Sequence, residues 1–298
     1  MYLKHFHLTE APFSLTPDTD FFFAAASHNE ALNTLLAAVA MGEGFIKVTA
    51  EVGLGKTLLC RLLLRELKDD VVTAYVPDPL LSPRSLRVAL ADELSVAVEN
   101  GASDEQRLRD IQARLMAIAA EGKRTVLLID EAHRLTADTL ESVRLLTNLE
   151  TEKTKLLQVV IVGQPELDRR LQGPELRQLR QRITFDCTLR PLGADDTAVY
   201  VSHRMALAAA GEPPRFSDRA IARVYRASRG IPRLVNLLCH KALLAAYGSG
   251  AAAVSDRHVR RAIADSRAAV SQPRTTFAPW QLLTRALRPA PVATGRTS

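Results

Sequence analysis

Cysteine is scarce in this sequence. The 298 residues contain only Cys60, Cys187 and Cys239, which lie far apart and form no C-x-x-C pair. No histidine completes a metal-ligand spacing with them, so the sequence indicates neither a disulfide framework nor a zinc site. This cysteine usage is typical of a protein from a reducing cytoplasm.

Signals for export and membrane insertion are also absent. The opening MYLKHFHLTEAPF lacks a basic start, an apolar run and a small-residue cleavage site, so we expect it to be mature sequence. The most apolar long stretch, Ala31 to Val48, is interrupted by polar and charged residues, which argues against a membrane span. We expect no membrane span, although docking at a membrane surface stays open.

Acidic residues are missing from one part of the chain. The net charge of +6 divides into −4 for residues 1–190, +5 for 191–265 and +5 for 266–298, where five arginines occur without any acid. Affinity for phosphate backbones depends on clustered Lys and Arg rather than on total charge. The basic charge of the C-terminal third is therefore the only feature of the composition that favours nucleic-acid binding.

Short apolar strands alternate with helical patterns over the first 190 residues. Buried runs of Val, Ile and Leu separated by helices predict a parallel sheet covered on both faces. The predicted fold class is therefore α/β, a three-layer sandwich with a five-stranded parallel sheet. The expected strands are 45–49, 71–76, 125–130, 156–163 and 183–189, and the expected helices are 29–41, one from Lys56, 83–98, 104–120 and 136–149.

The pattern changes at Pro191. Four helical segments follow without a strand between them, which predicts a small all-α domain over 191–267 after an α/β domain over 1–190. Residues 268–298 are rich in Pro, Arg, Ser and Thr, so we expect a basic, flexible tail. Within it, a short helix would place four apolar residues on one side, suited to a partner, to anionic lipid or to packing on the helical domain: Phe277, Trp280, Leu283 and Leu287.

Residues 49–57 read TAEVGLGKT and nearly match the phosphate-binding pattern G-x-x-x-x-G-K-[ST]. The stretch follows a β-branched strand and opens a helix, so its backbone N–H groups can converge on an anion at a helix N-terminus. Ala50 replaces the first glycine of the pattern. Alanine fits there without strain if the φ of residue 50 is negative. The predicted nucleotide-binding residues are Glu51, Val52, Gly53, Leu54, Gly55, Lys56, Thr57 and Leu58.

A second motif, TVLLIDEAH at 125–133, places Asp130 and Glu131 at a strand end. A nucleotide-bound Mg²⁺ needs a carboxylate there, so Asp130 and Thr57 are the predicted metal ligands. Glu131 can polarise an attacking water. Two solvated acids at a helix start would not explain the apolar run before them. We interpret His133 as a surface residue of the first helical turn. The two motifs together predict hydrolysis of ATP with Mg²⁺.

The chain resembles the AAA+ ATPases of the general secretion pathway protein A family, and within it the branch of the mannose-sensitive haemagglutinin (type IV) pilus biogenesis protein M. The absence of a peptidoglycan-binding module favours this shorter branch. Leu54 departs from the pattern, since the family commonly has serine there. The resemblance extends in order from Met1 to Asp265 through MYLKHFHLTEAPFSLTPDTDFFF, EVGLGKTLLCRLL, LLIDEAHRL, ESVRLLTNLET, LLQVVIVGQPELDRRL, LRQLRQRI and GIPRLVNLLCHKALLAA.

This resemblance implies further catalytic roles besides that of Glu131. Gln164 is similar to the first sensor, which touches the γ-phosphate or its water; the alternative is that it caps the helix that follows Pro165. Arg182 occupies the position of the arginine finger that acts on a neighbouring subunit's nucleotide, with Arg177 and Arg180 as competitors. Arg233 is similar to the second sensor, which reaches from the helical lid to the phosphates. Planar guanidinium groups match phosphate oxygens, which gives these roles a physical basis.

The resemblance also implies an Mg²⁺-dependent ATPase that works as a homo-oligomer, with a ring of undetermined size. It would be cytoplasmic or peripheral at the inner membrane, where pilus or secretion proteins would be its partners during assembly of a type IV pilus or type II secretion apparatus. The alternative is a DNA-binding ATPase of the transposition-helper type, favoured by the basic C-terminal third and opposed by the slightly acidic body. A third hypothesis, a module that binds ATP without turnover, conflicts with Glu131.

Overall fold

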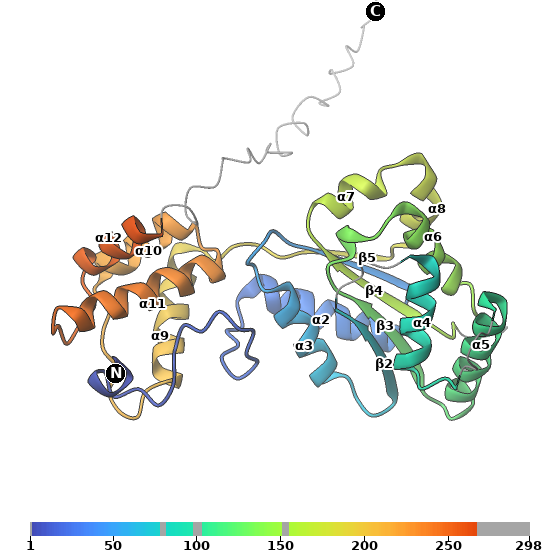
Figure 1. The fold of residues 1–298 in the computed structure, drawn as a ribbon, viewed down its shortest axis with the longest axis horizontal. Coiled ribbons are helices and arrows are strands. Elements are labelled where there is room, and N and C mark those ends of the chain that lie inside the picture. Colours follow the sequence, from blue (N-terminus) through green and yellow to red (C-terminus); the bar gives the residue numbers. More distant parts are fainter. Residues whose placement is uncertain (1, 78–81, 98–102, 151–154, 267–298) are drawn as a thin grey trace, which may run out of the picture.

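A five-stranded parallel sheet forms the centre of the α/β part of this computed structural model (Figure 1), which describes residues 2–77, 82–97, 103–150 and 155–266. The strand order is β2-β3-β4-β1-β5, and all neighbouring pairs are parallel. The predicted parallel sheet is thus confirmed, with small shifts at the strand ends. The strands are β1 Phe45–Thr49, β2 Val71–Val76, β3 Arg124–Ile129, β4 Gln158–Gly163 and β5 Phe185–Thr188.

Helices cover both faces of the sheet, because successive side chains of a strand point to opposite faces. Val126 and Leu128 of β3 pack in one core cluster with α2 and α3, whereas Leu127 and Ile129 pack in another with α4, α5, α6 and α7. The predicted three-layer sandwich is therefore confirmed. The helices are α2 Ala26–Met41, α3 Lys56–Glu66, α4 Pro83–Glu93, α5 Asp104–Ala120, α6 Ala137–Leu146 and α7 Glu166–Leu171.

Helix ends follow local chemistry. Helix α5 starts and ends as predicted, and its N-cap Ser103 accepts a hydrogen bond from the Gln106 N–H. Helix α4 ends at Glu93 instead of 98 because Ser95 has a φ of 55°, which no α-helix continues through. Between β4 and β5 the sequence predicted no helix bounds, since the elements there are too short for a periodic pattern: α7, η2 Pro174–Leu176 and α8 Arg177–Arg182.

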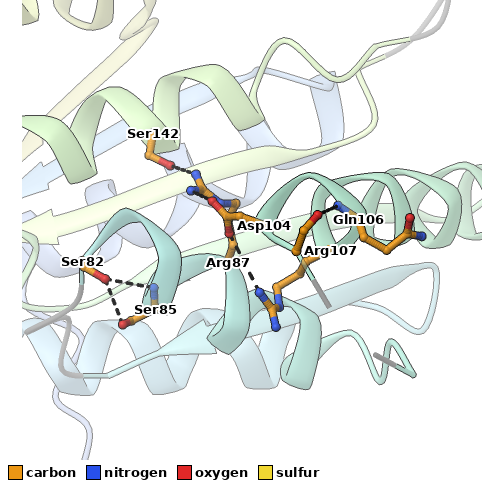
Figure 2. A network of polar contacts seen from close by, with 8 residues as sticks. Ser82, Ser85, Arg87, Asp104, Gln106, Arg107 and Ser142 are labelled. Atoms are coloured by element: carbon orange, nitrogen blue, oxygen red, sulfur yellow. Dashed lines mark hydrogen bonds and ion pairs between the residues drawn. The ribbon is translucent and has the colours of Figure 1, made fainter. Parts of the chain in front are cut away.

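Arg87 ties three helices of one face together (Figure 2). Its guanidinium forms a bidentate pair with Asp104 at the start of α5 and donates to Ser142 Oγ on α6 at 2.8 Å. The hydrogen bond from Arg87 holds the pKa of the Asp104 carboxyl below its usual value. Planar, two-point pairing fixes orientation as well as distance, so α4 and α5 are held in register against α6.

Four further helices, α9 Ala194–Leu207, α10 Asp218–Ser228, α11 Pro232–Gly248 and α12 Asp256–Asp265, pack around a core of their own. The short helix α1, Tyr2–His5, precedes them in the chain. Helices α9 to α12 correspond to the four predicted segments, and Ser217 caps α10 by accepting from the Ala220 N–H. No helix within the described ranges is long and apolar enough to cross a bilayer. The predicted tail, 268–298, and its apolar segment at 277–287 lie outside the described residues.

The N-terminal segment packs with these four helices. Figure 1 shows the N-terminus beside α9 and α11, and Phe6, Phe13 and Phe21 are buried in the same cluster as Tyr200 and the apolar side of α11. The guanidinium of Arg204 lies 4.8 Å over the Phe21 ring. This segment falls within the predicted α/β domain, 1–190, whereas its side chains contribute to the helical core. It therefore connects the two parts before α2 begins.

Gly230, between α10 and α11, lies close against the backbone of Leu192. Its φ is 73°, and a Cβ there would lie 2.0 Å from the carbonyl oxygen of Leu192. We expect Gly230→Ala to lower the free energy of unfolding by about 3 kcal/mol, from left-handed strain plus overpacking. Gly250→Ala is the matched control, since Gly250 has a φ of 67° with no atom near its Cβ position. Equal losses in urea unfolding of the two variants would contradict the role of the Leu192 contact.

Candidate nucleotide-binding site

The phosphate-binding loop runs from Ala50 to Gly55 between β1 and α3. Gly53 and Gly55 have φ values of 84° and 93°, a left-handed region that glycine enters without strain. A Cβ on Gly53 would also lie 2.9 Å from the Cβ of Arg233. The sequence thus has glycine at the two positions where the loop backbone requires it.

Ala50 stands where the motif has glycine. Its side chain is buried in the core cluster that contains Val48 and Val162, and its N–H donates to the Gly163 carbonyl at 3.0 Å. Its φ is not positive, because the described non-glycine residues with positive φ lie elsewhere. The methyl group therefore fits beneath the loop without strain.

Lys56 and Thr57 open α3 at the end of the loop. The Lys56 amine lies 3.2 Å from the Ala50 carbonyl oxygen and 3.4 Å from that of Glu51, so it reaches back over the loop. The Thr57 hydroxyl donates to Asp130 Oδ2 at 2.7 Å. Burial raises the pKa of the Asp130 carboxyl, and the hydrogen bond from Thr57 acts in the opposite direction. This contact joins the two sequence motifs across the sheet.

The Thr57–Asp130 pair has the chemistry of an Mg²⁺ site that is completed by a nucleotide. Among the residues that the structure describes, no three His, Cys, Asp or Glu side chains cluster as metal ligands. Mg²⁺ bound with a nucleotide takes only one or two protein ligands and keeps phosphate oxygens and water as the others. A hydroxyl and a carboxylate in contact at the helix start therefore fit this ion.

Glu131 and Gln164 meet at the same edge of the sheet because β3 and β4 are neighbours. Gln164 Nε2 lies 3.4 Å from Glu131 Oε2. The Gln164 side chain faces this carboxylate and does not cap α7, whose N-cap is Pro165 without a side-chain hydrogen bond. Glu131 has a φ of 51°, a left-handed conformation that costs about 1–2 kcal/mol in a non-glycine residue. Such strain concentrates at functional sites.

His133 belongs to this polar cluster, which corrects its interpretation as a surface residue. Its Nε2 lies 2.9 Å from Gln164 Nε2, and its Nδ1 lies 3.6 Å from Glu131 Oε2. Burial lowers the pKa of His133, so the ring is largely neutral at pH 7. The turn η1, Ala132–Arg134, folds back onto β4 because Gly163 leaves room: a Cβ on Gly163 would lie 3.1 Å from the His133 backbone nitrogen.

A cavity of about 230 Å³ lies between the loop, Glu131, Gln164 and the first turn of α11. Arg233 lines it from α11, and the Arg233 N–H donates to the Gly53 carbonyl at 3.2 Å. A lysine, two arginines (Arg204 and Arg233) and two helix N-termini at one cavity suit a polyanionic ligand. Most of the predicted loop, acid and lid residues line this cavity, whereas three do not: Glu51, Leu54 and Asp130. Leu54 and Asp130 are buried beneath it.

The N-terminal segment forms another wall of this cavity, with Ser14 to Asp18 along it. Helical side chains hold the segment in place: Asn236 Nδ2 donates to the Ser14 carbonyl at 3.2 Å, and Arg204 Nε donates to the Pro12 carbonyl at 2.5 Å. No sequence motif predicted this wall. Residues 14–18 read SLTPD and have no helical or strand period, so only the packing shows that they line the cavity.

Arg182 lies away from this cavity. It ends α8 and lines a separate hollow with Gly44 and Phe45, at the N-terminal end of β1, whereas the loop follows the C-terminal end. Its Nη1 donates to Thr147 Oγ1 at 3.2 Å. Since β1 has five residues, roughly 16 Å separate its two ends. Arg182 therefore cannot reach the cavity of its own subunit.

Comparison with known proteins agrees with this geometry. The AAA domain family matches residues 39–171. Solved structures share the fold, among them the Aeropyrum pernix ORC2 protein (TM-score 0.66, 16% identity, 86% of this chain and 71% of that one) and the Thermotoga maritima RuvB motor (TM-score 0.52, 18% identity, 85% and 73%). The fold and the site together define an AAA+ ATPase of the P-loop class.

The sequence comparison narrows this class. General secretion pathway protein A of Aeromonas hydrophila is 43% identical over 250 residues, which cover 84% of this chain. The chain belongs to the AAA+ ATPase family of general secretion pathway protein A. It spans just under half of that relative's length, at 46%.

Proposed function

We propose that this chain is an Mg²⁺-dependent ATP hydrolase whose nucleotide cycle drives assembly of a type II secretion or type IV pilus apparatus at the inner membrane. The observation that supports catalysis is the convergence of the loop, the Thr57–Asp130 pair and the Glu131–Gln164 pair on one cavity. The cellular role is supported by the relative's name, general secretion pathway protein A.

Each side chain has a proposed role in this reaction. The amides of residues 51–58 and the Lys56 amine bind the phosphates of ATP. Thr57 and Asp130 hold Mg²⁺, which when bound neutralises phosphate oxygens. Glu131 accepts the proton of the attacking water, and Gln164 orients that water. Arg233 contacts the phosphates from the helical side, so that the nucleotide connects the α/β domain, 1–190, to the lid, 191–267.

Assembly is part of the proposed mechanism. Arg182 lies at the opposite end of β1 from the loop of its own chain, so we assign it to the nucleotide of an adjacent subunit in a homo-oligomer. A guanidinium at the nucleotide stabilises the negative charge of the phosphoryl group during its transfer. The site is complete only when a second copy supplies this charge.

Binding of ATP tests the proposal directly. We expect the wild-type protein to bind ATP with Mg²⁺ in isothermal titration calorimetry, and Lys56→Ala to weaken the affinity by about 10- to 100-fold. The reason is the loss of a charge-assisted hydrogen bond to the phosphates. Chelation of Mg²⁺ should abolish hydrolysis by the wild-type protein.

Lys68→Ala, which removes an exposed lysine beyond the end of α3, is the control and should bind ATP like the wild-type protein. The proposed site would be contradicted if the wild-type titration showed no heat of binding. It would also be contradicted if the Lys56→Ala variant bound ATP as tightly as the wild-type protein.

A DNA-binding ATPase is the second candidate. One observation favours it: α10 and α12 pack together and expose several arginines. Part of this charge is neutralised, because Arg223 and Arg260 pair with Asp256. A mobility shift with duplex DNA at several salt concentrations separates the candidates, since DNA binding through these arginines would weaken steeply with salt. No shift at low salt would remove this candidate.

A further inference from the structure

His28 contacts the phosphate-binding loop from behind. It lies in the first turn of α2, its side chain is 5% exposed, and its Nε2 is 2.7 Å from the carbonyl oxygen of Leu54. The ring also fills the space beside Gly55, where a Cβ would lie 3.4 Å from His28 Nε2. No sequence motif pointed to this residue, because α2 is separated from the loop by the whole of β1.

The chemistry of this contact fixes the protonation of the ring. A carbonyl oxygen only accepts hydrogen bonds, so Nε2 must carry a proton. Burial lowers the pKa of His28, although the hydrogen bond to Leu54 opposes this shift. The ring is therefore a neutral imidazole at pH 7 with its proton on Nε2, and Nδ1 faces the Ser27 hydroxyl at 3.5 Å.

Ser27, next to His28, attaches the start of α2 to the connection between β5 and α9. The Arg190 N–H donates to Ser27 Oγ at 3.3 Å, and Ser27 Oγ lies 3.3 Å from the Arg190 carbonyl oxygen. The start of α2, and with it the position of His28, is thus attached to a segment of backbone outside the loop. The loop carbonyl is held by a side chain whose own position is fixed.

Holding one carbonyl determines where the next amide points. The peptide bond is planar and trans, so the Leu54 C=O and the Gly55 N–H point in opposite directions. Gly55 lines the cavity that faces Lys56 and Glu131. With the Leu54 oxygen drawn toward His28, the Gly55 N–H is turned away from α2, in the orientation of an amide that binds an anion in a loop of this kind.

We propose that His28 is a positioning residue that holds the Leu54–Gly55 peptide in its phosphate-binding orientation. This inference rests on the proposed function, since it concerns the same nucleotide. His28 itself does not touch the phosphates. It acts on binding through the Leu54 carbonyl, so its loss changes the affinity for ATP more than the rate of turnover by saturated enzyme.

Three substitutions of His28 test the inference. Gln can place an amide donor near the position of the imidazole Nε2, whereas Asn is too short. We expect His28→Asn to raise the Kd and KM for MgATP roughly tenfold, with kcat within about threefold of wild-type, and His28→Gln to restore most of the affinity. His28→Phe, which fills the space without a donor, should behave like the Asn variant. Thermal unfolding without nucleotide reports the stability of each variant.

His5→Phe is the matched control. His5 Nε2 also contacts a backbone carbonyl, that of Ala251 at 3.1 Å, but far from the loop, and its loss should leave the KM unchanged. Asn and Gln variants that bind MgATP equally well would overturn the inference. If the Phe variant does not fold, the Asn and Gln pair still decides. A wild-type protein that does not bind MgATP would instead overturn the proposed function, so the two failures are distinguishable.

Discussion

The Glu131→Gln variant is expected to bind MgATP as tightly as the wild-type protein and to hydrolyse it at least about 10²-fold more slowly. General-base catalysis contributes roughly 10²- to 10⁴-fold to a rate, and an amide cannot accept the proton of the attacking water. The Thr57–Asp130 contact and the Lys56 amine are untouched by this change. Phosphate release and nucleotide affinity, measured on the same preparation, check the prediction.

The geometry of Glu131 makes this substitution selective. Gln has the same size as Glu and meets the same left-handed backbone at φ 51°, so strain is equal in both proteins. The backbone N–H of residue 131 still donates to Asp130 Oδ1, which it does at 2.7 Å. Glu66→Gln, at the exposed end of α3, is the control for a change of one charge. Unchanged phosphate release by Glu131→Gln would remove Glu131 as the base.

The Arg182→Ala variant is expected to lose about 10³-fold in kcat, because an arginine supplied to a neighbouring nucleotide contributes 10³ to 10⁵. Its affinity for MgATP should stay close to wild-type, since Arg182 lies at the other end of β1 from its own loop. The specific activity of the wild-type protein should rise with protein concentration, as subunits associate. Steady-state ATPase assays over a range of protein concentrations measure both effects.

Mixing two inactive variants tests whether the arginine acts between subunits. Arg182→Ala keeps an intact loop and Glu131, whereas Glu131→Gln keeps Arg182. In a mixed oligomer, an Arg182→Ala site beside a Glu131→Gln subunit regains the missing guanidinium, so the mixture should hydrolyse ATP faster than either variant alone. Arg177 and Arg180 are exposed on the same helix, and their Ala variants are the matched controls. If Arg180→Ala were inactive and the Glu131→Gln variant restored hydrolysis to it, and not to Arg182→Ala, the arginine finger would be Arg180.

Much of the α/β fold could be predicted because its signals are local. Strands such as β1 and β2 are short β-branched runs, and their bounds agree with prediction. The helix start at Lys56 follows from the loop motif, and capping serines mark the starts of α5 and α10. Elements of six residues or fewer, such as α7 and α8, carry too few residues for a period and were missed.

The candidate site was predicted in part for the same reason. Lys56, Asp130 and Glu131 belong to two motifs whose residue types and spacing indicate their roles. Gln164 and Arg233 depended on a family resemblance, and the structure places both at the cavity that the motifs form. His133 was misjudged, because only the packing of η1 against β4 shows that its ring lies beside Gln164.

The sequence by itself determined the elements of this ATPase: which runs become strands, where the phosphate loop turns, and which acids can face a nucleotide. These depend on local signals, namely the hydrophobic period and the spacing of residues within motifs. The tertiary structure alone decided which distant residues meet. The order β2-β3-β4-β1-β5 places Glu131 beside Gln164, packing brings His28 and the N-terminal segment to the loop, and the length of β1 separates Arg182 from it. Such contacts depend on chain topology and side-chain packing, which cannot be predicted from local patterns because the residues that meet lie far apart in the sequence.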